Sequence, residues 1–136
     1  MTAYARAFAR AADGITWSYP CLIWVSDYAL DLTGNDPAER FRSWAWDERK
    51  SMRAMASAGR GMPGTTPVER ALHDIAERCE WFEVDEPEGH CVGVYDLGEI
   101  GVPAIYDGIG RWLAATAEGA IVTARAPKKI WRLPIA

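Results

Sequence analysis

The pattern of apolar residues changes near Cys79, and this change constrains the fold more than any other feature of the sequence. Before Cys79, apolar residues recur every three or four positions, which is typical of helices that bury one face. After it, short stretches rich in β-branched and aromatic residues alternate with glycine, proline and acidic turns. Helices followed by strands predict an α+β fold, with N-terminal helices packed on a small C-terminal antiparallel sheet.

The helix boundaries are marked by capping signals. Thr66 is followed by Pro67 and then by Glu69, which is the pattern of a capping box with proline in the first turn, and Asp36 opens a similar pattern. The expected helices span residues 3–12, 21–32, 36–58 with a break near Trp46, and 67–79. The expected strands span residues 81–84, 91–95, 102–106, 120–123 and 130–133.

Length and composition indicate one globular domain over residues 1–136. Apolar residues make up 49% of the chain and charged residues 25%, which is enough for an ordinary hydrophobic core. The formal net charge of −4 comes with no basic stripe, which argues against nucleic-acid binding. We expect no secretory signal and no membrane span. The protein is therefore expected to be made in a cytoplasm. Three cysteines without regular spacing do not predict a disulfide framework.

Cys21 is the first candidate for chemistry. It is expected in the first turn of a largely apolar helix, where backbone N–H groups and the helix dipole favour a reactive thiolate. Cysteine peptidases combine such a thiol with a histidine that a sheet supplies. The alternative is that Cys21 is a small apolar residue of the core, since free cysteines are often buried.

Two histidines could act as the base. His73 shares a helix face with charged residues, so it is predicted to be a surface residue. His90 precedes the strand expected at 91–95, which suits a Cys–His pair in order and rough distance. The alternative for His90 is a turn residue in the polar stretch 85–90.

Several short strings of the sequence carry a family resemblance. Residues 20–27 read PCLIWVSD, residues 32–37 read LTGNDP, residues 92–95 read VGVY, and Trp131-Arg132 stands near the end. This arrangement resembles an uncharacterised family of phage tail-module proteins, which is similar to the NlpC-like (papain-like) cell-wall peptidases. The resemblance implies an NlpC-like fold, a place in the virion tail, other tail proteins as partners, and peptidoglycan as a further partner.

The sequence departs from the peptidase pattern at two positions. The peptidases carry Asp-Cys, whereas this chain has Pro20-Cys21. They also carry histidine directly before a Val-Gly-Ile-Tyr strand, and superposing that strand on residues 92–95 places Cys91 in the histidine position. His90 would then point to the opposite face of the sheet. A third polar position falls near Tyr106 or Asp107, and the site is expected to be degenerate.

The function expected from these features is a structural or interaction protein of a phage or prophage tail, made in the host cytoplasm. One alternative is an active cysteine peptidase or amidase that cleaves peptidoglycan stem peptides, with Cys21 as nucleophile, His90 as general base and Asp107 as orienting group. Another alternative is a tail assembly factor that is absent from the finished particle.

Tryptophans offer a further candidate surface. The chain has seven, most of which are expected in the core, while Trp44, Trp46 and Trp112 could instead anchor a partner. Neither paired cysteines nor paired histidines occur at metal-ligand spacing, so no metal and no cofactor are predicted.

Overall fold

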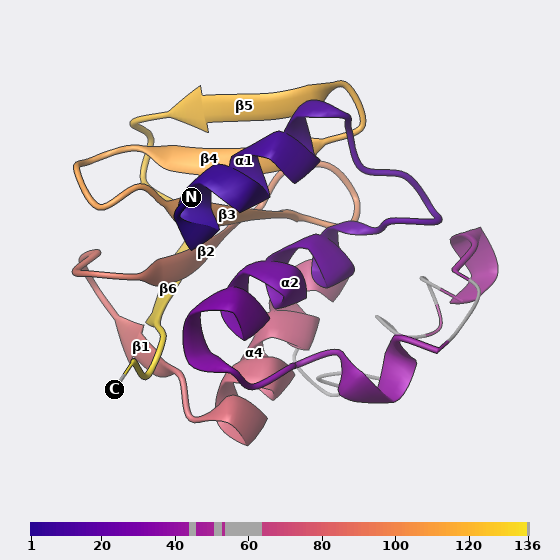
Figure 1. The fold of residues 1–136 in the computed structure, drawn as a ribbon, viewed down its shortest axis with the longest axis horizontal. Coiled ribbons are helices and arrows are strands. Elements are labelled where there is room, and N and C mark those ends of the chain that lie inside the picture. The colour runs from indigo at the N-terminus through magenta and orange to yellow at the C-terminus, as the bar shows by residue number, and fades with distance from the viewer. Residues whose placement is uncertain (44–45, 51–52, 54–63, 136) are drawn as a thin grey trace.

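The structure is a computed structural model that describes residues 1–43, 46–50, 53 and 64–135. It has the α+β architecture that the sequence predicts (Figure 1). The helical elements whose bounds are described include α1 (Ala3–Ala12), α2 (Cys21–Thr33), the short 3-10 helix η1 (Glu39–Phe41) and α4 (Pro67–Cys79). The strands are β1 (Phe82–Val84), β2 (Cys91–Tyr95), β3 (Val102–Tyr106), β4 (Trp112–Thr116), β5 (Gly119–Thr123) and β6 (Lys129–Arg132).

The six strands form one antiparallel sheet in the order β1-β6-β2-β3-β4-β5. The last strand, β6, therefore lies between β1 and β2. Val92 of β2 is opposite Ile105 of β3 on one side and Trp131 of β6 on the other. All five residues of β2 are buried, so this strand forms the centre of the fold.

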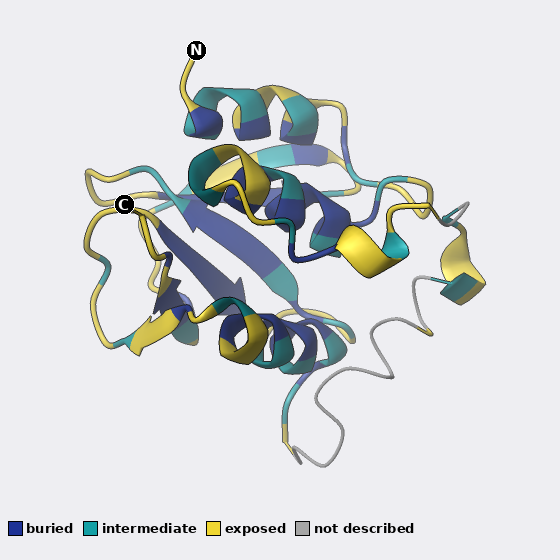
Figure 2. Cartoon of the chain, turned by 60° about the horizontal axis from the view of Figure 1, so that its bottom comes forward, coloured by how far each residue is buried: buried dark blue, intermediate teal, exposed yellow. Residues whose placement is uncertain are grey.

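The helices cover one face of the sheet, as the sequence predicts. Helix α1 contacts β4 and β5, α2 contacts β3 and β4, and α4 contacts β3. Figure 2 shows the buried sides of these helices turned towards the central strands. Trp24 of α2 is fully buried in this core, and its indole N–H donates to the carbonyl of Ala7 in α1 at 3.0 Å. The strands add to the same core the residues Val92, Val94, Ile105, Leu113, Ala115 and Trp131.

A second cluster lies on the other face of the sheet. Its buried residues are Cys91, Tyr95, Ala104, Trp112, Ala114 and Ile130, none of which belongs to a helix. The segment 124–128 between β5 and β6 packs over this face. The hydroxyl of Tyr95 donates to the carbonyl of Arg125, and Pro127 approaches Gly93 so closely that a Cβ there would lie 2.6 Å from the proline ring.

Two of the expected features differ in the structure. Residues 36–43 do not begin an α-helix but form a turn and η1. Residues 48–50 are helical after the break expected near Trp46, and most of the remaining residues of the expected helix lie outside the described part of the chain. Arg42 lies back on this turn and pairs with both Asp36 and Asp27 of α2. The second difference is β4, a strand that the sequence reading missed. Among the described residues, no helix is long and apolar enough to cross a membrane.

Candidate functional site

Cys21 lies at the N-terminus of α2 and faces an apolar cleft of about 540 Å³. The cleft is bounded by the α1–α2 linker, the β2–β3 loop, the start of β3 and the end of β4. Its lining residues are Ile15, Thr16, Trp17, Pro20, Cys21, Leu97, Gly98, Ile100, Gly101, Val102, Pro103, Ala115, Thr116 and Ala117. Trp17 and Leu97 are exposed, whereas Cys21 is only 4% exposed.

The α1–α2 linker is held firmly against the sheet. The N–H of Ile15 donates to the carbonyl of Thr116 at 3.0 Å. Gly14 has a φ of 81°, and a Cβ at this position would lie 2.6 Å from the carbonyl oxygen of Ala117. Only glycine therefore allows this approach, which fixes one wall of the cleft.

Burial dominates the chemistry of the Cys21 thiol. Removal from water raises its pKa to about 12, although the backbone N–H groups of Cys21 and Leu22 act in the opposite direction. The activation expected from the helix N-terminus is thus outweighed, and the thiol is protonated at neutral pH.

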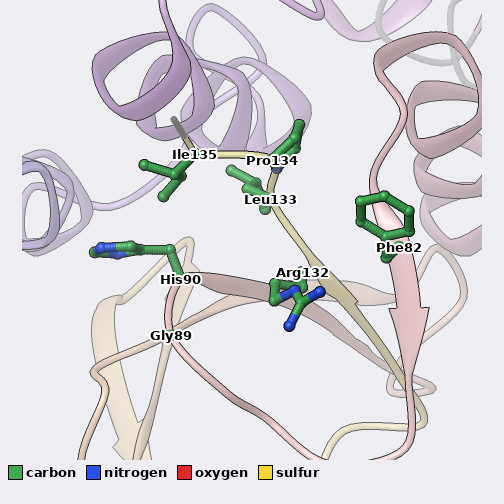
Figure 3. A pocket seen from close by; sticks show the side chains of 7 residues that line it. All are labelled: Phe82, Gly89, His90, Arg132, Leu133, Pro134 and Ile135. Atoms are coloured by element: carbon green, nitrogen blue, oxygen red, sulfur yellow. The ribbon is translucent and has the colours of Figure 1, made fainter.

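His90 is placed at the opposite end of the sheet from Cys21. It directly precedes β2, whereas the Cys21 cleft lies beyond the other end of that strand, where Tyr95 pairs with Val102. His90 is exposed and lines a separate pocket with Phe82, Gly89, Arg132, Leu133, Pro134 and Ile135 (Figure 3). The two cavities share no residue, so the structure does not bring His90 to the thiol.

The expected position of Cys91 also needs correction. Its side chain belongs to the cluster on the helix-free face, while the neighbouring Val92 faces the helices. Because side chains alternate along a strand, Cys91 is turned away from the face that α2 covers. Cys91 therefore does not occupy a histidine position opposite Cys21. The superposition of the Val-Gly-Ile-Tyr strand placed Cys91 on the wrong face of the sheet.

Asp107 is a turn residue rather than a partner of Cys21. Its Oδ1 accepts hydrogen bonds from the N–H groups of Ile109 at 2.8 Å and Arg111 at 3.0 Å, which shape the β3–β4 hairpin. The residue follows the end of β3 that lies away from the Cys21 cleft. The three proposed catalytic residues are thus split between the two ends of the sheet.

An unforeseen charged cluster links α4 to the start of β6. Glu69 is only 2% exposed, and its carboxylate lies 2.7 Å from Lys128 Nζ and 3.3 Å from His73 Nε2. The His73 ring also meets Trp131 edge-on, with centroids 5.0 Å apart. His73, predicted to be a surface residue, is thus only partly exposed, at 25% of its side chain. Because Glu69 lies three residues after Thr66, the N-cap of α4, the sequence predicted only a capping contact for it. The ion pair with the distant Lys128 was therefore missed.

The candidate tryptophans have different environments. Trp112 is 3% exposed within the cluster on the helix-free face, so its ring is not available as a surface anchor. Trp46 is partly buried beside Phe41 and borders a groove between α2 and α4. Trp44 lies outside the described residues. Trp24, Trp81 and Trp131 are buried, which agrees with the prediction that most tryptophans belong to the core.

Among the described residues, no group of three or more histidine, cysteine, aspartate or glutamate side chains could hold a metal ion. No protein-family model, curated protein or solved structure matches this chain. The class of the protein therefore rests on its own architecture, an α+β fold with helices on one face of a six-stranded antiparallel sheet.

Proposed function

We propose that this chain is a non-catalytic interaction module of a phage or prophage tail. The proposal rests on the family resemblance of the sequence and on the residues that line the Cys21 cleft. The observation that carries it is the separation of Cys21 from both histidines of the chain, neither of which lines the cleft. Transfer of an acyl group from a substrate to a thiol needs a base within about 3–4 Å to take the thiol proton and deliver it to the leaving amine.

The cleft itself supports a binding role. Its walls are largely apolar, and the exposed Trp17 and Leu97 lie at its rim. A volume of about 540 Å³ is within the range of sites that hold a small ligand or one or two side chains of a partner. A protonated thiol at the base of such a cleft acts as a small apolar surface.

The catalytic alternative is tested by incubating the purified protein and its Cys21→Ala variant with peptidoglycan, and by measuring released stem peptides with mass spectrometry. We expect no release above background from either protein. An active NlpC-like peptidase serves as the positive control. Release by the wild type but not by Cys21→Ala would establish the peptidase function and refute the proposal.

Membership of the tail is tested separately by quantitative mass spectrometry of purified particles from the phage that encodes the chain. We expect the protein at a fixed ratio to the tail proteins. If particle assembly requires the protein but the particles lack it, the chain is an assembly factor instead.

A further inference from the structure

The pocket beside His90 combines exposed apolar side chains with an arginine, whereas none of the described residues that line the Cys21 cleft is charged. We call it the His90 pocket, and it is lined by Phe82, Gly89, His90, Arg132, Leu133, Pro134 and Ile135. Its volume is about 620 Å³, and it lies at the edge of the sheet where β1 pairs only with β6 (Figure 3). Phe82 is 56% exposed and Ile135 is also exposed, so large apolar side chains meet solvent on two sides of it.

Arg132 gives this pocket a cationic centre. It is an exposed residue of β6, directly opposite Phe82 in the sheet register, and its guanidinium carbon lies 5.8 Å from the centre of the Phe82 ring. Within the described parts of the chain, Arg132 forms no ion pair, whereas Lys129 of the same strand pairs with Glu83. The guanidinium lies at cation–π distance from the ring, and its N–H groups remain available to an acceptor.

We propose that the His90 pocket binds a segment of a partner protein that carries a single carboxylate next to apolar side chains. The carboxylate pairs with Arg132, because a guanidinium binds a carboxylate through two parallel hydrogen bonds. The adjacent apolar side chains pack on the exposed Phe82 and Ile135. The inference does not depend on the assignment of the chain to a phage tail.

The surrounding charges limit what the partner segment can carry. Asp85, Glu86 and Glu88 precede the pocket in the β1–β2 loop. They would repel a densely acidic segment, so one carboxylate among apolar residues fits better than an acidic run. They also disfavour a second copy of this chain as the occupant, because its own acidic loop would meet the same charges.

The test uses two synthetic peptides that differ in one group, acetyl-Ile-Leu-Asp-Leu-Ile-amide and its Asp→Asn analogue. Both are titrated into the isotopically labelled full chain while the amide and ring signals of Phe82, His90 and Ile135 are followed by nuclear magnetic resonance. We expect the aspartate peptide to bind about tenfold more tightly than the asparagine peptide, because the charge-assisted pair is lost in the latter.

Two arginine variants provide matched controls. Arg132→Gln should abolish the difference between the peptides, whereas Arg125→Gln should preserve it, because Arg125 is exposed but does not line the pocket. Unchanged signals elsewhere in the spectrum show that both variants are folded. Equal binding of the two peptides, no binding at millimolar concentration, or a response confined to the Cys21 cleft would each overturn the proposal. So would a concentration-dependent dimer that Arg132→Gln dissociates.

Discussion

At the scale of single residues, Cys21 shows how two opposing effects are decided by burial. The N-terminus of α2 favours a thiolate, since backbone N–H groups and the helix dipole stabilise negative charge there. The side chain is nevertheless almost completely removed from water, and the loss of hydration outweighs these contributions. The sequence identifies the helix position but not the depth of the residue, which depends on the linker and the β2–β3 loop above it.

This balance predicts that Cys21 reacts slowly with iodoacetamide. With a pKa of about 12 in place of 9.0, its thiolate fraction at pH 8 is about a thousandfold lower than that of an unperturbed thiol, and burial also restricts access. Cys79, which is less buried, should react first in the native protein. Peptide mapping by mass spectrometry measures both rates, and unfolding in urea should make them equal. Faster labelling of native Cys21 than of Cys79 would contradict the burial argument.

Glu69 provides a second prediction at the residue scale. Lys128→Met leaves a buried carboxylate with His73 as its remaining neighbour, whereas Glu69→Gln leaves a neutral amide and a lysine that can turn to solvent. Lys128→Met should therefore lower the free energy of unfolding more than Glu69→Gln does. The double variant should resemble Glu69→Gln alone. Urea denaturation of the three variants measures the order, and a smaller effect of Lys128→Met would disprove it.

At the scale of elements, the sequence predicts the helices and strands whose sequence patterns lie within the element itself. The helices at 3–12, 21–32 and 67–79 are confirmed within one residue at either end, because periodicity and capping residues lie within the helices themselves. Strand β4 was missed, since the alanine-rich stretch from Trp112 to Thr116 is extended only through pairing with β3 and β5.

The candidate site was less predictable than the fold. Cys21 and His90 are in the expected order along the chain, but strand order and register decide which end of β2 meets α2. The spacing of two residues in a sequence does not contain that information. The same applies to Glu69 and Lys128, which lie far apart in the sequence and form an ion pair only after α4 docks on the sheet.

A pair of glycines in the β2–β3 loop tests how this loop holds α4. Gly98 and Gly101 both have positive φ, but only at Gly101 would a Cβ collide with Thr66, the N-cap of α4, at 2.4 Å from Oγ1. Gly98→Ala should cost about 1 kcal/mol for the left-handed conformation alone. Gly101→Ala should cost about 2–4 kcal/mol, because the cap is also displaced. Equal losses in chemical denaturation would show that the Thr66 contact is unimportant.

At the scale of the whole molecule, the two faces of the sheet are covered in different ways. Among the described residues, α1, α2 and α4 cover one face, and the segment 124–128 that crosses from β5 to β6 covers the other. This crossing places the last strand in the interior of the sheet, between β1 and β2. The final part of the chain thus completes the sheet, because β2 gains its second neighbouring strand only when β6 is in place.

This topology predicts a gradient of stability across the sheet, measurable by native-state hydrogen exchange. The amides of β2 should exchange only through global unfolding, because both neighbours β3 and β6 and both covering layers must be lost to expose them. The amides of β1 should exchange through local opening, because this strand has three residues, a single neighbouring strand and largely exposed side chains. Exchange rates in increasing urea separate the two cases, since only the β2 amides should show the full denaturant dependence of global unfolding. If β1 and β2 respond alike, the edge strand unfolds together with the centre of the sheet, and the His90 pocket beside β1 is as rigid as the core.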